Sequence, residues 1–290
     1  YCALSYCWGS SNTCTTTTKN LSARTTAIPL DEFSKTIKEA ILLLRNIGIH
    51  YLWVDALCIL QDSPADWAVE AAKMSQIYSG AMLTIAAENA QDSSEGLFQV
   101  SDQIPQVIPN PPPNQSQSKS PYWNSDESRP LSSRGWCLQE NLLSARKIHV
   151  MLHDSIWSCY QKGISNSRKV LRRGTRTGLF TTQAELRFRN ALRLNTDQDY
   201  VFRGSIFEIF RNWAGWVGDY TRRSFTYESD RLMALDGICT SLEKAFGGTF
   251  VAGMWTGQFL AHSLLWHPDQ RAKESWPSPQ PEVPSWSWVS

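Results

Sequence analysis

Tyr51-Leu52-Trp53-Val54-Asp55-Ala56-Leu57-Cys58-Ile59 is a continuous apolar run that a single carboxylate interrupts. Such a run predicts a β-strand buried on both faces, with Asp55 at or near its carboxyl end. The next segment, Ser63-Pro64-Ala65-Asp66, combines an N-cap serine, a proline at the first helical position and an early acidic residue. The two segments together predict a strand followed by a helix.

The neighbouring segments repeat this alternation. Residues 2–8 predict a strand that ends in the turn-forming Gly9-Ser10-Ser11-Asn12. Apolar residues at helical spacing predict helices over 33–44 and 63–80, and 81–87 reads as another buried strand. This order predicts an α/β fold with a mostly parallel sheet and helices on both faces.

The pattern is interrupted once and then resumes. Residues 99–130 carry seven prolines among Ser, Asn and Gln, which predicts a mobile insertion. A helix over 134–145 and a strand around 147–152 follow. We therefore expect a first domain over 1–154.

Beyond about residue 155 the chain is rich in aromatic residues. Helical spacing of Phe and Trp predicts helices over 206–220 and 230–246. Several of the 13 tryptophans lie near the C-terminus. We expect residues 155–290 to form an α-rich, Trp-rich region packed on the first domain.

Composition limits the functional classes. The net charge of +1 gives no electrostatic footprint for nucleic acid, and no run approaches the roughly 18 apolar residues of a membrane span. No signal peptide is expected, because no basic segment precedes an apolar one at the start. Seven cysteines without a Cys-x-x-Cys pair indicate a reduced, cytoplasmic protein.

The segment Ser133-Arg134-Gly135-Trp136-Cys137-Leu138-Gln139-Glu140 carries the strongest chemical pattern. Trp136 and Glu140 are four residues apart, so in a helix the indole and the carboxylate share one face. This pair suits a site that holds a flat heterocycle and stabilises a developing cation. The alternative is a buried tryptophan and a solvated glutamate on an amphipathic helix.

Further candidates lie where the first predicted strand ends. Ser5, Tyr6, Trp8 and Gly9 fall at a carboxyl edge, where open α/β sheets bind ligands. Gly9 allows close backbone approach and Trp8 offers a surface for a base. The alternative is a core aromatic beside a turn glycine.

Three polar residues complete the candidate binding set. Asp55 needs a partner in its apolar strand, and it either binds ligand or caps a neighbouring loop. Gln61 and Arg134 are candidates for orienting phosphate or ribose groups, and the alternative for each is an exposed loop position.

Other chemistries have weaker signals. Cys58 and Cys137 are interpreted as buried structural thiols, because the histidines form no signature for a thiol nucleophile. No closely spaced ligand pairs indicate zinc, so no metal is expected. No Gly-x-Gly-x-x-Gly motif or P-loop is present, so no dinucleotide redox cofactor is expected.

Read together, these segments resemble the fungal heterokaryon-incompatibility (HET) domain. The order and spacing of the motifs carry the resemblance. They are Ala3-Leu4-Ser5-Tyr6-Cys7-Trp8-Gly9, the helix at 36–40, Tyr51 to Asp62, Met74 to Ala81, Gly96-Leu97-Phe98 and Arg134 to Glu140. Downstream, Asp230-Arg231-Leu232-Met233-Ala234-Leu235, Gly253-Met254-Trp255 and Pro284-Ser285-Trp286-Ser287-Trp288 resemble segments that often follow this domain.

The HET family is distantly similar to TIR domains, which implies a flavodoxin-like sheet. In catalytic TIR domains a glutamate in a Trp-Cys-x-x-Glu motif is required to cleave the nicotinamide–ribose bond of NAD, and the resemblance assigns that role to Glu140. The Pro/Ser-rich insertion before the motif departs from the TIR pattern, and no equivalent of the TIR loop over the substrate is visible.

The resemblance implies an NAD-hydrolysing enzyme of fungal non-self recognition and programmed cell death, with NAD or a related nucleotide as ligand and activity that depends on self-association or on a partner. Two alternatives stay open. One is a non-catalytic signalling module with the Trp-rich region as interaction surface, and the other is a nucleotide-processing enzyme acting on another substrate.

Overall fold

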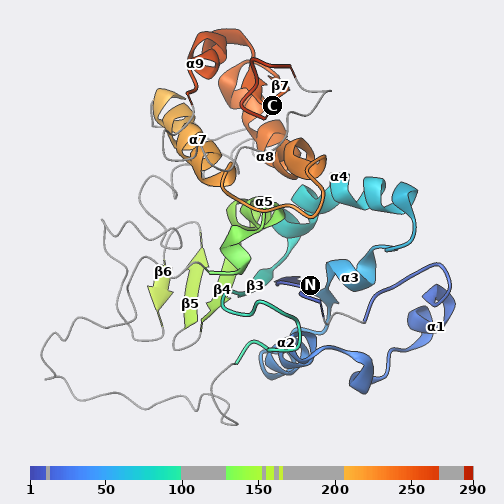
Figure 1. Cartoon of the computed structure of the whole chain (residues 1–290). Coiled ribbons are helices and arrows are strands. Elements are labelled where there is room, and N and C mark those ends of the chain that lie inside the picture. Colours follow the sequence, from blue (N-terminus) through green and yellow to red (C-terminus); the bar gives the residue numbers. More distant parts are fainter. Residues whose placement is uncertain are drawn as a thin grey trace, which may run out of the picture. The chain divides into compact units, whose positions relative to one another are not determined.

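The computed structural model describes residues 1–10, 14–98, 129–151, 155–159, 163–165, 206–267 and 284–289 (Figure 1). The chain folds as two compact units, each assembled from segments that are distant in sequence. The sheet unit comprises Tyr1–Trp67, Ala81–Ser132 and Ala145–Thr182. The helical unit comprises Ala68–Gly80, Ser133–Ser144 and Gln183–Ser290.

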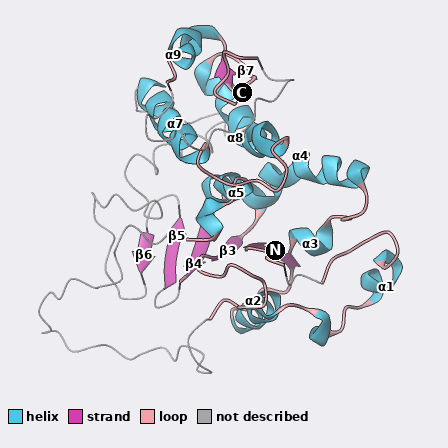
Figure 2. Cartoon of the chain, viewed as in Figure 1, coloured by secondary structure: helices cyan, strands magenta, loops and turns pink. Residues whose placement is uncertain are grey.

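The described strands of the sheet unit form one six-stranded sheet, coloured magenta in Figure 2. They are β1 (Cys2–Ser5), β2 (Leu52–Trp53), β3 (Leu83–Ala87), β4 (Arg146–Val150), β5 (Ser155–Cys159) and β6 (Gly163–Ser165). Their order is β2-β1-β3-β4-β5-β6. The first three pairings are parallel and the last two antiparallel, which confirms the predicted α/β fold with a mostly parallel sheet.

The centre of this sheet is apolar because neighbouring strands align aliphatic residues. In the parallel register Leu4 pairs with Ile85, and Ile85 pairs with Ile148. Helix α2 (Lys35–Asn46) buries Ile37 and Leu44 in the same core. Its apolar residues recur three and four apart, as the sequence predicted, so one helical stripe covers the sheet.

The run from Tyr51 to Ile59 corrects one prediction. Only Leu52 and Trp53 form a strand, and Asp55–Cys58 is a single helical turn, α3. Asp55 Oδ1 accepts the N–H of Ala56 at 2.7 Å, and a carboxylate at a helix start is favourable for the exposed donors there. This turn leaves Cys58 exposed, so the prediction that its thiol is buried is wrong, whereas Cys137 is buried as expected.

The loop after β1 also contains more structure than the sequence indicated. Between β1 and α2, Leu21–Thr26 forms helix α1, followed by the 3-10 helix η1 (Leu30–Glu32). The first strand ends at Ser5, earlier than the predicted residue 8. The predicted insertion over 99–130 falls almost wholly outside the described residues.

The helical unit confirms the predicted elements of the second half. Helices α7 (Ile206–Tyr220) and α8 (Asp230–Phe246) have the predicted bounds. The unit also contains α5 (Trp136–Leu143), the greater part of α4 (Pro64–Gly80), the hairpin of β7 (Phe250–Val251) and β8 (Met254–Trp255), the 3-10 helix η4 (Gly257–Phe259) and α9 (Leu260–Leu264). The predicted domain boundary at residue 154 stays a prediction.

Aromatic side chains fill the core of the helical unit. Trp213 and Trp255 are buried, with their rings 5.8 Å apart at a steep angle, and Phe246 packs edge-on against Trp255 at 4.7 Å. Edge-to-face packing at these distances is favourable for aromatic rings.

In the described part of the chain no helix has both the length and the apolarity needed to cross a membrane.

Candidate functional site

The strand order places a topological switch point between β1 and β3. The chain leaves β1 for β2 on one side and then returns to β3 on the other side. Loops at the carboxyl ends of the two strands diverge at such a point, and open α/β sheets bind their ligands there. We therefore take the segments that follow β1 and β3 as the candidate site of the sheet unit.

Hydrogen bonds join these two segments. The N–H of Ser10 donates to Asp92 Oδ2 at 2.8 Å, and the N–H of Ser93 donates to the carbonyl oxygen of Trp8 at 3.2 Å. Gly9 lies between them with φ +66°. A Cβ at this position would lie 2.0 Å from Asp92 Oδ2, so both the backbone conformation and the contact require glycine.

The indole of Trp8 is held by Asp55. Trp8 Nε1 donates to Asp55 Oδ2 at 2.9 Å, while the other carboxylate oxygen receives the N–H of Ala56. Trp8 and Asp55 are both half-buried. Asp55 therefore fixes the orientation of a partly exposed aromatic ring and also accepts a hydrogen bond at the start of its own helical turn.

Gln61 acts within the chain. Its Nε2 donates to the carbonyl oxygens of Asp55 and Ile59, at 3.1 and 2.9 Å. These two bonds use both hydrogens of the amide nitrogen. Gln61 closes the loop after α3, so in this structure its amide nitrogen has no hydrogen left for a phosphate or ribose.

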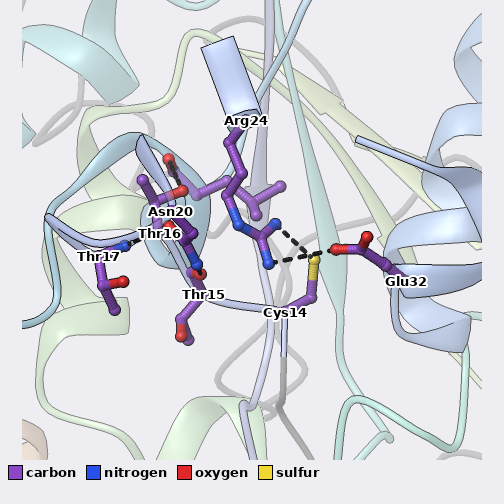
Figure 3. Close-up of polar contacts among 8 residues, drawn as sticks. Cys14, Thr15, Thr16, Thr17, Asn20, Arg24 and Glu32 are labelled. Atoms are coloured by element: carbon purple, nitrogen blue, oxygen red, sulfur yellow. Dashed lines mark hydrogen bonds and ion pairs between the residues drawn. The ribbon is translucent and has the colours of Figure 1, made fainter. Parts of the chain in front are cut away.

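The segment after residue 13 is tied to the same loop. Thr16 receives the N–H of Gln61 on its carbonyl oxygen, and its hydroxyl donates to the carbonyl oxygen of Leu57 at 2.7 Å. Figure 3 shows the adjoining contacts, in which Arg24 reaches Cys14 Sγ at 3.3 Å and Glu32 at 3.5 Å. Thr16 is therefore hydrogen-bonded to the turn that carries Asp55 and to the loop that follows it.

Ser5 and Tyr6 are buried, with 4% and 2% of their surfaces exposed. Tyr6 belongs to the apolar core of the sheet unit. Ser5 is the last residue of β1 and Tyr6 follows it, and in this structure both are buried. The alternative of a core aromatic applies to Tyr6, whereas Trp8 is half-buried and held by Asp55.

Three predicted site residues lie in the helical unit. Glu140 and Trp136 are both on α5, so their four-residue spacing puts them on one helical face, as expected. Glu140 is only 5% exposed, so the alternative of a solvated glutamate is wrong for this residue. The Trp136 indole donates to Asp230 Oδ2 at 3.2 Å, and the Arg134 carbonyl oxygen receives Nη1 of Arg223 at 3.3 Å.

The nine candidate residues are thus divided between the two units. Ser5, Tyr6, Trp8, Gly9, Asp55 and Gln61 belong to the sheet unit, and Arg134, Trp136 and Glu140 belong to the helical unit. The side chains of Asp55, Gln61 and Trp136 are each held by hydrogen bonds to other residues of the chain.

A chain of buried polar side chains was missed by the sequence analysis. Glu88 Oε1 lies 2.6 Å from His149 Nδ1, and His149 Nε2 lies 3.3 Å from Ser158 Oγ. All three residues are buried, so Ser158 is not open to a substrate and this series of hydrogen-bonded side chains is structural. The available signal was Lys147 and His149, two polar residues that alternate on one face of a buried strand.

Burial and hydrogen bonding shift several titrating groups. Burial raises the pKa of the Cys2 thiol to about 12 and that of Cys239 well above its usual value, which disfavours the thiolate at both. Hydrogen bonds from Thr18 lower the pKa of Asp62.

Within the described residues no group of three His, Cys, Asp or Glu side chains is placed to hold a metal ion.

Comparison with known protein families gives a match to the first part of the chain. The family model described as "Heterokaryon incompatibility protein (HET)" matches residues 1–140. The match ends inside α5, at the glutamate of the Trp-Cys-x-x-Glu motif. No curated protein and no solved structure matched.

Proposed function

The chain carries a heterokaryon incompatibility (HET) domain over residues 1–140, and from this premise we propose that it hydrolyses the nicotinamide–ribose bond of NAD to trigger fungal cell death. Glu140 is the proposed key carboxylate. NAD is the substrate in this proposal, and no resident cofactor or metal takes part.

The observation that carries the nucleotide assignment is the construction of the switch point. Two loops are bonded together around Gly9, and the ring of Trp8 is fixed by Asp55 while remaining partly exposed. A held aromatic face at the carboxyl edge of a parallel sheet suits a stacked base or nicotinamide ring. These features support nucleotide binding by the sheet unit.

The chemistry assigned to Glu140 requires little more than one carboxylate. Cleavage of an N-glycosidic bond develops positive charge on the ribose, and a nearby carboxylate offsets that charge and binds the ribose hydroxyls. Nicotinamide leaves as a neutral molecule, so a general acid is not needed. The low exposure of Glu140 supports this role, because electrostatic stabilisation is strongest away from water.

The test is NAD turnover by the purified protein over a wide range of protein concentration, because activity in this family is expected to depend on assembly. Nicotinamide release is measured by chromatography. Glu140→Gln keeps the size of the side chain and removes its charge. The same change in Glu70→Gln, at a half-buried residue of α4 that pairs with Lys73, is the control.

Release that disappears in Glu140→Gln and persists in Glu70→Gln is the expected result. Release that is the same in both variants would overturn the role of Glu140. A folded wild-type protein that releases no nicotinamide at any concentration would overturn the enzymatic proposal.

The second candidate is a non-catalytic signalling module. The contacts of Asp55, Gln61 and Trp136 favour it, because each of these side chains is already bound within the chain. This candidate predicts that Glu140→Gln leaves cell-death signalling in fungal cells unchanged, whereas the enzymatic proposal predicts its loss.

A further inference from the structure

We infer that helix α8 holds α5, the helix that carries Glu140, in position. Gly237 and Asp230 of α8 are then positioning residues for the reaction. The inference rests on the proposed function for its catalytic consequence. Its structural part concerns the helical unit alone, in which α5, α8 and most of α4 lie together.

The apolar side of α5 packs on α8. Leu138 and Leu142 are fully buried, in the same core as Leu235, Ile238 and Leu242 of α8. Leucine and isoleucine at three- and four-residue spacing on two helices form interlocking ridges and grooves. This contact fixes the rotation of α5 about its own axis, which also sets the direction of the Glu140 side chain.

Gly237 permits the close approach. It lies in the interior of α8, and the N–H of Gly237 donates to Gln139 Oε1 at 3.0 Å. A Cβ at position 237 would lie 2.2 Å from Ser75 Cβ on α4 and 2.6 Å from Gln139 Oε1. Glycine inside a helix costs about 1 kcal/mol relative to alanine, so the close contact supplies its physical reason here.

The beginning of α5 is held at a second point. Asp230, which is 9% exposed, is the first residue of α8 and receives the indole N–H of Trp136 at 3.2 Å. Gly135 packs against the ring of Phe225, which a Cβ would overlap at 1.8 Å. The N–H of Gly135 also donates to the carbonyl oxygen of Ser224 at 3.0 Å.

These contacts involve residues that come just before Glu140 in the sequence. Trp136 lies one turn before it, and Gln139 directly precedes it. The residues that hold them, from Ser224 to Gly237, all lie outside the segment that matches the HET family. In this inference the second half of the chain contributes to catalysis by holding α5, the helix that carries the Glu140 carboxylate.

The experiment uses the full chain and a matched pair of helix glycines. Gly237→Ala adds a methyl group at the α4–α5–α8 contact, and Gly215→Ala adds one on α7, where no described atom lies within 4 Å. Hydrogen exchange of the α5 peptide over 136–143 and the kcat and KM for NAD are measured in both. A third variant, Ser75→Gly combined with Gly237→Ala, removes the nearest opposing Cβ.

The expected result is faster exchange in α5 for Gly237→Ala, with exchange in β1 and β3 unchanged. A misplacement of about 1 Å reduces kcat by about 100-fold while KM changes little. Gly215→Ala leaves both readouts as in the wild type, and the variant with Ser75→Gly restores them in part.

Asp230→Ala and Asp230→Asn provide a second route if Gly237→Ala does not fold. Asparagine retains an oxygen that accepts the Trp136 indole N–H, so it should preserve both readouts, whereas alanine should not. Unchanged α5 exchange in both Gly237→Ala and Asp230→Ala would overturn the inference, and so would changed exchange with an unchanged kcat.

Loss of the proposed function gives a different result. In that case the wild type turns over no NAD, yet the exchange measurements still decide whether α8 holds α5. The two failures are therefore separable.

Discussion

The cores of the two units are formed by different kinds of side chain. The sheet unit has a core composed mainly of Leu, Ile, Val and Ala, and its loops are joined by hydrogen bonds and buried polar groups. The helical unit is held by aromatic rings, among them Trp213, Phe246, Trp255 and Phe259. One unit should therefore be sensitive to lost polar partners, and the other to lost volume.

The largest expected effect is a cavity in the aromatic core. Phe246 is fully buried and packs against both Trp255 and Phe259. Phe246→Ala should destabilise the protein by about 4 kcal/mol, because a buried ring is lost and rigid neighbours cannot fill its place. Ile85→Val in the sheet core should cost only about 1 kcal/mol. Urea unfolding measures both, and equal losses would contradict the proposed difference.

The next effect tests the polar interior of the sheet unit. His149→Leu leaves Glu88 buried without its imidazole partner, and such a loss should cost about 3 kcal/mol. The control is Lys73→Met, which breaks the exposed Lys73–Glu70 pair and should cost less than about 1 kcal/mol. Chemical denaturation of the two variants compares a buried pair with an exposed one. A His149→Leu variant as stable as the control would show that the buried chain contributes little.

Two glycines with similar φ angles allow the cost of a left-handed backbone to be measured separately from the cost of a steric clash. Gly9 lies at the candidate site and Gly48 does not. Gly9 and Gly48 have φ of +66° and +75°, but only position 9 has a neighbour, Asp92, where a Cβ would lie. Gly48→Ala should cost about 1 kcal/mol from the left-handed backbone, and Gly9→Ala about 2 kcal/mol or more. Thermal unfolding measures the stability of each. Nucleotide binding, followed by calorimetry, should weaken in Gly9→Ala only, and equal effects would remove the contact from the explanation.

The smallest effect concerns the surface of the sheet unit at acid pH. Hydrogen bonds from the hydroxyl and the N–H of Thr18 lower the pKa of Asp62 in the folded protein. A carboxyl group with a lowered folded pKa stabilises the fold above its unfolded pKa, and this contribution disappears as the pH falls through the folded pKa. Asp62→Asn should therefore reduce stability slightly at neutral pH and flatten its decline in acid. A parallel decline in the variant and the wild type would show that other groups control acid unfolding.

Much of the architecture could be predicted from local patterns. The bounds of α7 and α8 follow from aromatic and aliphatic residues at helical spacing, and β3 follows from an apolar run. The prediction failed at Asp55, where a short polar side chain can satisfy the donors of a helical turn. Hydrophobicity alone does not distinguish that turn from a strand.

The candidate site was predictable only in part. Sequence patterns located Trp8, Gly9 and Glu140, because each lies in a distinctive motif. They did not indicate that Asp55 holds the ring of Trp8, that Asp230 holds the ring of Trp136, or that Glu88 meets His149. These partners are 47, 94 and 61 residues apart, and no local pattern encodes contacts over such distances.

The sequence by itself determined the alternation of strands and helices, the parallel start of the sheet and the match of residues 1–140 to the HET family model. These properties follow from the periodicity of apolar residues and from short motifs, which are local. Only the tertiary structure decided that Trp8 is held by Asp55 and that the helix with Glu140 shares a compact unit with α8. The physical reason is that packing and buried hydrogen bonds depend on which surfaces meet after the chain has folded.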